Sequence, residues 1–88
     1  MSFFVYLIVS RKNFKLKTYV GYTHSLKKRL VLHNSGRGAK STKGRIWKIA
    51  YFKKYNSKKK AMSQEYLLKK DRKKRKIIIT KFLSTNKV

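Results

Sequence analysis

The stretch TYVGYTHSLKKRLVLHN, Thr18 to Asn34, contains the clearest structural signals in the chain. Its first three residues favour a β-strand, and hydrophobic side chains then return at Leu26 and Leu30 with the spacing of one helical face. Thr23 or Ser25 can supply the hydroxyl that caps the first turn of a helix. The stretch therefore predicts a strand that leads into a short helix ending near residue 34.

A β-hairpin is predicted before this helix. The apolar segment Phe3–Ser10 has the composition of a strand that is buried on both faces, and Thr18–Thr23 supplies the returning strand. The basic segment RKNFKLK, residues 11–17, separates them. Its length predicts a loop longer than the tight two-residue turn.

The second half of the chain predicts one more strand and two helices. The strand is expected at Ile46–Tyr55, and Ser57 can cap a helix that breaks near Asp71 before a last basic helix ending near Leu83. Asp71 is expected to serve as a structural cap. The order β-β-α-β-α-α predicts an α+β fold with a small three-stranded antiparallel sheet and packed helices. We expect residues 1–88 to form a single domain of two layers, since a chain this short buries one modest core.

The composition favours nucleic acid as the partner. The chain has 26 Lys and Arg against 2 Asp and Glu, a formal charge of +24, which a polyanion would relieve. No apolar run approaches the roughly 20 residues of a membrane-spanning helix, and the first strand does not resemble a secretion signal. We therefore expect an intracellular protein, cytoplasmic or nuclear, that is not in a membrane. Without cysteine, the chain has no disulfide, thiolate zinc site or cysteine nucleophile.

A glycine-rich basic loop, SGRGAKSTKGR at residues 35–45, follows the first helix. Backbone amides and basic side chains in such a loop can approach a phosphate. Together with the helix before it, the loop supplies the predicted nucleic-acid contacts, which are Lys27, Lys28, Asn34, Arg37, Lys40, Thr42, Lys43 and Arg45.

Arg29 and His33 are one helical turn apart, so their side chains share a face and can address one bound group. Lysine supplies 20 of the 26 basic residues, which makes arginine the less expected choice at this position. Its planar guanidinium suits bidentate contact with a phosphate. The alternative is that both residues lie on a solvated basic surface.

Glu65 is placed between Ala61 and Leu68 on the helix face that is expected to turn inward, together with Met62. A carboxylate in that position needs a cation. Either Lys69 supplies it in an ordinary ion pair, or a weakly held Mg²⁺ does, completing its coordination with water and substrate phosphate.

Taken together, these residues resemble the GIY-YIG nuclease family, in particular its short stand-alone, single-domain branch. The segments FVY, residues 4–6, and YVG, residues 19–21, are similar to the family's two signature elements. Arg29, His33 and Glu65 follow in the family's order. Phe4 stands where glycine is usual. The resemblance covers residue 3 to about residue 83.

The resemblance implies a metal-dependent endonuclease that hydrolyses phosphodiester bonds in DNA, of the kind used in DNA repair or recombination. It implies that Glu65 holds Mg²⁺ or Mn²⁺ and that Arg29 stabilises charge on the phosphoryl oxygens. Tyr6, Tyr19 or His33 is the base that takes the proton from water. Because the chain lacks the additional DNA-binding modules of larger relatives, little sequence specificity is expected, and a protein partner is one source of substrate choice.

Two other classes of function are consistent with the composition. A non-catalytic basic nucleic-acid-binding protein would explain the lysines but leaves the inward-facing Glu65 unexplained. A membrane-surface protein would use the basic, apolar-containing segment 72–83 as an amphipathic helix. That segment is expected instead to pack on the sheet.

Overall fold

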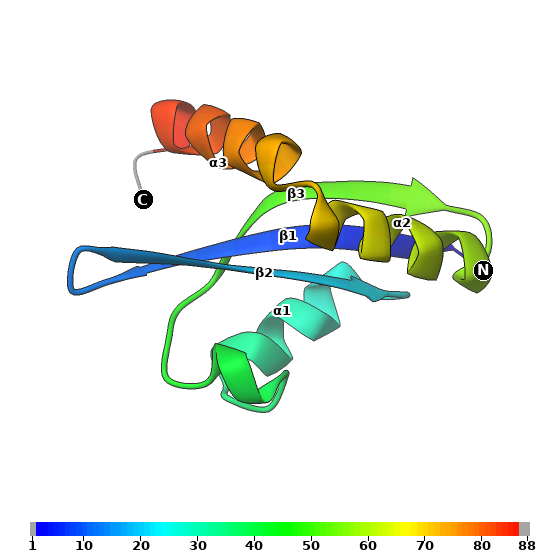
Figure 1. Ribbon diagram of the computed structural model, residues 1–88. Coiled ribbons are helices and arrows are strands. Elements are labelled where there is room, and N and C mark those ends of the chain that lie inside the picture. The colour runs from blue at the N-terminus through cyan, green and yellow to red at the C-terminus, as the bar shows by residue number, and fades with distance from the viewer. Residues whose placement is uncertain (1, 87–88) are drawn as a thin grey trace.

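The computed structural model describes residues 2–86. It contains three strands, three α-helices and one short 3₁₀ helix in the predicted order β-β-α-β-α-α (Figure 1). The elements are β1 (Phe3–Lys12), β2 (Lys15–Thr23), α1 (Leu26–Asn34), η1 (Lys40–Thr42), β3 (Lys48–Tyr55), α2 (Lys58–Lys70) and α3 (Arg72–Asn86).

The sheet has the order β2-β1-β3, with both pairings antiparallel. β1 is the central strand, and its residues 5–10 are all buried, as the uninterrupted apolar sequence predicted. The α+β fold class and the three-stranded antiparallel sheet are confirmed.

Helices cover both faces of this sheet, so the expectation of two layers was wrong. On one face, Val5, Leu7 and Val9 of β1 pack in a core cluster with residues of α2 and α3. On the other face, Tyr6 and Ile8 pack with Trp47 and with the apolar side of α1 (Figure 1). Successive side chains of a strand point to opposite faces, so a strand that is apolar throughout needs cover on each of them.

The hairpin turn is shorter than predicted. β1 and β2 remain paired to Lys12 and Lys15, which leaves a two-residue turn of Asn13 and Phe14. Both turn residues have positive φ, 53° and 65°, as in the tight turns whose twist matches that of paired strands. The basic residues extend the ladder because backbone pairing does not require apolar side chains, and their own side chains are exposed.

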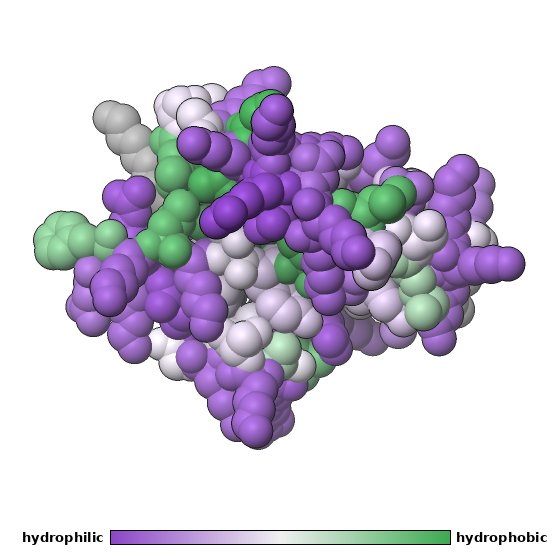
Figure 2. All heavy atoms as spheres, viewed as in Figure 1, coloured by the Kyte–Doolittle hydropathy of each residue, from purple (hydrophilic) through white to green (hydrophobic). Residues whose placement is uncertain are grey.

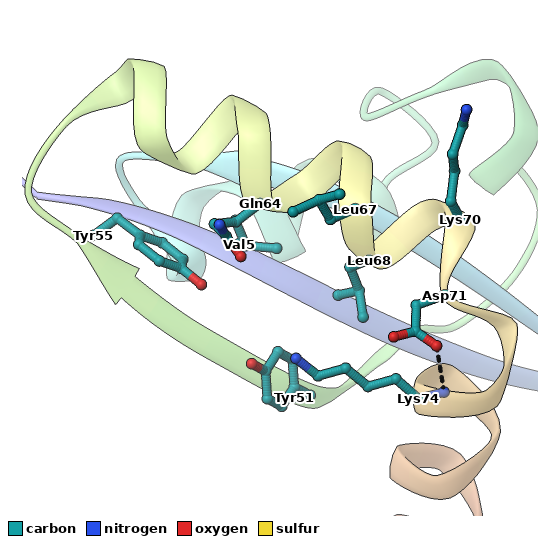
Figure 3. A pocket seen from close by; sticks show the side chains of 9 residues that line it. All are labelled: Val5, Tyr51, Tyr55, Gln64, Leu67, Leu68, Lys70, Asp71 and Lys74. Atoms are coloured by element: carbon teal, nitrogen blue, oxygen red, sulfur yellow. Dashed lines mark hydrogen bonds between the residues drawn. The ribbon is translucent and has the colours of Figure 1, made fainter.

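The helix caps follow the sequence closely. Ser25 caps α1 by accepting a hydrogen bond from the Lys28 amide, and Ser57 caps α2 in the same way. Asp71 ends α2 and its Oδ1 accepts from the Lys74 amide at 3.0 Å, which confirms its structural role (Figure 3). The last helix extends three residues beyond the predicted end at residue 83, and β3 begins at residue 48 instead of 46.

Most of the face shown in Figure 2 is hydrophilic. Within residues 2–86, no helix is both long enough and apolar enough to cross a bilayer.

Candidate active site

Three aromatic rings from different elements meet on the α1 face of the sheet. Tyr6 comes from β1, Tyr19 from β2 and His33 from the last turn of α1. Ring centroids of Tyr6 and His33 are 5.8 Å apart, those of Tyr19 and His33 5.0 Å, and those of the two tyrosines 6.3 Å. The predicted catalytic residues on these three elements therefore form one cluster.

Two glycines allow this close approach. Gly21 lies opposite Tyr6 in the β1–β2 register, and a Cβ there would lie only 2.5 Å from the Tyr6 hydroxyl oxygen. A Cβ at Gly38 would lie 2.3 Å from Nδ1 of His33. Glycine at these two positions lets backbone pack directly on the rings, and His33 is completely buried.

A hydrogen-bond chain determines the tautomer of His33. Thr42 donates its only hydroxyl proton to the Ala39 carbonyl at 2.9 Å, so its oxygen accepts from Nδ1–H of His33 at 3.0 Å. Nε2 of the neutral imidazole then carries a lone pair, and the Tyr6 hydroxyl donates to it at 2.8 Å. Thr42 thus orients the imidazole toward Tyr6.

Burial shifts the pKa values of both His33 and Tyr6. Burial, reinforced by the positive charge of Arg29, lowers the pKa of His33 below its usual value. Burial also raises the pKa of Tyr6, although its interaction with Arg29 acts in the opposite direction and Glu65 adds a smaller increase. Near neutral pH, a neutral His33 therefore accepts a hydrogen bond from a protonated Tyr6.

Arg29 borders the cluster from the middle of α1. Hydrogen bonding with the Tyr6 hydroxyl raises the pKa of Arg29. Its Nε atom is buried and has no hydrogen-bond partner within residues 2–86. An unpaired buried donor on a charged group is costly, and an anionic oxygen from a ligand would satisfy it.

Glu65 has two observed features that bear on metal binding. Its side chain is 17% exposed and lies 3.5 Å from the ammonium of Lys69, whose side chain is 51% exposed. An ion pair with so exposed a lysine is weak and easily replaced. No group of three acidic, histidine or cysteine ligands occurs in the described part of the chain, so Glu65 fits only a cation that takes its other ligands from water and phosphate.

The inward face of α2 was only partly predicted. Ala61 and Leu68 are buried, as expected, but Met62 is 48% exposed. The part of α2 that contacts the sheet is narrow, and Met62, which directly follows Ala61, already faces solvent.

The predicted nucleic-acid contacts separate into exposed cations and side chains bonded within the protein. The exposed cations are Lys27, Lys28, Arg37, Lys40 and Lys43.

The other three predicted contacts form hydrogen bonds with other groups of the protein. Thr42 is completely buried, so the prediction that its side chain contacts nucleic acid was wrong. Asn34 uses both ends of its amide on the backbone of Trp47, at 2.6 and 3.3 Å. Arg45 donates to the backbone oxygens of Ser10 and Lys15 and to the Ser10 hydroxyl. Arg45 ties the loop to the sheet, whereas Thr42 and Asn34 join the segment after α1 to α1 itself.

A wider groove lies on the opposite face of the sheet, between β3, α2 and the start of α3 (Figure 3). Tyr51, Tyr55 and Lys74 line it with the capping carboxylate of Asp71. Lys74 already lies over the Tyr51 ring, 5.9 Å from its centroid. None of the predicted catalytic residues lines this groove, so the aromatic cluster with Arg29 is the better candidate site.

The sequence matches a family model for a known catalytic domain. The family model described as the GIY-YIG catalytic domain matches residues 2–78. The chain belongs to the GIY-YIG family. The recognition made from the sequence is thereby confirmed, and the family indicates a nuclease that acts on DNA with a divalent metal.

Relatives of this GIY-YIG chain carry the name UPF0213. One from Streptococcus pneumoniae is 45% identical over 69 residues, which is 77% of this chain and 67% of that protein. One from Oceanobacillus iheyensis is 40% identical over 67 residues, 75% of this chain and 74% of that protein. The solution NMR structure of a UPF0213 protein from Bacillus halodurans is 34% identical, covers 91% of this chain and 84% of that one, and has a TM-score of 0.49.

The buried His33 predicts a loss of stability on mild acidification. Its pKa is lowered in the folded state, so between the usual value of about 6.5 and the lower folded value the unfolded chain binds more protons. The free energy of unfolding should therefore fall as the pH decreases below about 6.5. Urea denaturation from pH 7 to pH 5 should show this fall, and His33→Gln should remove most of it.

This window suits the measurement because the chain has only 2 carboxylate side chains and 2 histidines. His24, which is exposed, provides the matched control, since His24→Gln makes the same substitution outside the buried cluster. Equal pH dependence in the wild type and His33→Gln would contradict the assignment of a neutral, buried His33.

Proposed function

We propose that this chain, residues 1–88, is a single-domain, metal-dependent endonuclease that hydrolyses phosphodiester bonds in DNA with little sequence specificity. The observation that carries the proposal is the buried, unpaired Nε of Arg29 beside the ring cluster of Tyr6, Tyr19 and His33. A phosphoryl oxygen is the ligand that would satisfy this donor. A protein partner is one proposed source of preference among DNA substrates.

In the proposed reaction, water attacks the phosphorus atom and the bond to the 3′ oxygen breaks. The Tyr6 hydroxyl accepts the proton from water while its own proton passes along the existing 2.8 Å hydrogen bond to Nε2 of His33. The proton then returns from the buried imidazolium through the Tyr6 hydroxyl to solvent. The 3′ oxygen leaves as an alkoxide and takes a proton from water. Arg29 stabilises the negative charge that develops on the phosphoryl oxygens.

Glu65 is the residue that would hold Mg²⁺ or Mn²⁺, in place of its weak pairing with Lys69. Such an ion, when bound, polarises the phosphoryl group and stabilises the leaving oxygen.

Nicking of supercoiled plasmid DNA, with Mg²⁺ and with a chelator, tests the proposed activity. We expect metal-dependent conversion to the nicked circle. The alternative is a non-catalytic nucleic-acid-binding protein, which the pairing of Glu65 with Lys69 favours. Tight binding without cleavage of plasmid, nicked, branched or single-stranded DNA in either metal would support that alternative.

Tyr6→Phe is expected to lower the rate of nicking by about 10²- to 10³-fold, the usual contribution of a positioned base. Phenylalanine keeps the ring packing but removes the oxygen that links water to His33. Tyr19→Phe is the matched control and should cost less than about tenfold, because Tyr6 bonds His33. Single-turnover nicking rates of the two variants measure these effects. A severe loss of rate in Tyr19→Phe, with a nearly wild-type rate in Tyr6→Phe, would reverse the two roles.

DNA binding is expected to depend strongly on salt. The five exposed cations of α1 and the following loop, with Arg29, make about six phosphate contacts, so log K should fall with log salt at a slope near −5. Fluorescence anisotropy with a duplex in chelator measures this slope. Lys40→Ala should reduce its magnitude by about one, whereas Lys74→Ala on the opposite face should not change it.

A further inference from the structure

The tip of the β1–β2 hairpin has a composition that does not suit its conformation. Phe14 has a φ of 65°, in a left-handed region that bulky side chains rarely adopt. Glycine is the residue that usually follows asparagine in a two-residue hairpin turn. The Asn13–Phe14 turn is therefore not optimised for folding.

The Phe14 side chain also contributes no burial. It is fully exposed, at 102% of its reference area. In the space-filling view, an apolar group projects from the end of the molecule where the hairpin tip lies (Figure 2). The ring is thus available to a partner, and neither backbone preference nor core packing accounts for it.

The hairpin is fixed against the basic loop that follows α1. Lys12 donates to the Gly44 carbonyl at 2.9 Å and Lys17 to the Ser41 carbonyl at 2.8 Å. Arg45 donates from the loop side to the Lys15 carbonyl at 3.1 Å. These bonds hold the hairpin beside the loop that carries the exposed cations Arg37, Lys40 and Lys43.

The chemistry around the ring identifies its partner. Exposed Arg11, Lys12, Lys15 and Lys17 flank the tip, so an aromatic face is presented within strong positive charge. Nucleic acid combines phosphate with stackable bases, and aromatic rings in basic surfaces stack on bases that are unpaired.

We propose that Phe14 stacks on an unpaired base of the DNA held by the site, and so directs the nuclease to DNA with single-stranded segments. The proposal rests on the proposed function. Lys12 lies six residue steps along β1 from Tyr6, which places the tip about 20 Å from the ring cluster at about 3.3 Å per residue. The unpaired base would therefore lie about six base steps from the scissile phosphate.

Binding in chelator tests the contact without catalysis. The probes are a labelled duplex with a single-stranded overhang and a fully paired duplex of the same length. Phe14→Ala should weaken binding to the overhang duplex about tenfold and leave the paired duplex unchanged, while Phe14→Trp should retain the wild-type preference. Phe14→Gly should raise the melting temperature, since glycine suits the turn, and still show the binding loss.

The outcomes separate this proposal from the proposed function. Failure of the wild type to bind either duplex would contradict DNA as the substrate. Tight wild-type binding with equal affinity of Phe14→Ala for the overhang duplex would refute only the stacking role. An equal loss on both duplexes would also refute the role assigned to Phe14 on unpaired bases.

Discussion

Arg29→Ala is expected to nick supercoiled DNA about 10³-fold more slowly than the wild type in Mg²⁺, the scale of losing a transition-state cation. The reason is geometric. The buried Nε has no hydrogen-bond partner within residues 2–86, so no protein acceptor competes for it with the phosphoryl group whose charge grows during reaction. Single-turnover nicking measures the loss, and DNA affinity in chelator should change little because other cations supply most of it.

Two variants in α1 distinguish the effect of the planar guanidinium group from the effect of a positive charge. Arg29→Lys should remain close to Arg29→Ala, since an ammonium cannot provide the planar pair of donors. Lys28→Ala removes one exposed charge from the same helix and should keep nearly wild-type nicking at low salt. Full activity in Arg29→Lys would mean that Arg29 acts only as a point charge.

Glu65→Gln is expected to reduce nicking by about 10³-fold at low Mg²⁺, a loss of several kcal/mol of metal stabilisation. Glutamine keeps the size of the side chain but removes the negative charge. Asp71, the other acidic side chain of the chain, is occupied at a helix start and cannot substitute. Rates measured across a Mg²⁺ and Mn²⁺ titration should show whether higher metal concentration recovers part of the activity.

Lys69→Ala provides the matched control for Glu65. It removes the paired ammonium, which lies 3.5 Å from the carboxylate, and leaves the carboxylate itself. We expect half-maximal activity at lower Mg²⁺ than in the wild type, because the cation competing for Glu65 is gone. If Glu65→Gln kept the wild-type rate at every metal concentration, Glu65 would have only the structural ion pair as its role.

Local sequence signals predicted the elements well, and mistakes arose where neighbours in space decided the outcome. Ser57 is predicted as a cap and Ser25 is one of two candidates with Thr23, because a cap bonds an amide three residues away. The hairpin loop was predicted too long because basic residues 11–17 resemble a turn, although a ladder can carry exposed charges wherever its partner strand continues. Met62 was placed inward because helical periodicity does not reveal how narrow a contact is.

The sequence by itself determined the strongly positive charge, the apolar central strand and the one-turn spacing of Arg29 and His33, which depend only on residue type and on nearby residues. The tertiary structure decided how these residues are used. Tyr6 and His33 are 27 positions apart, and Thr42 lies nine beyond His33. Their hydrogen bonds exist because β1 and α1 pack together while Gly21 and Gly38 leave room. The tautomer of His33, the burial of Thr42 and the unpaired Nε of Arg29 all depend on that packing, since each is a property of atoms brought together only by the fold.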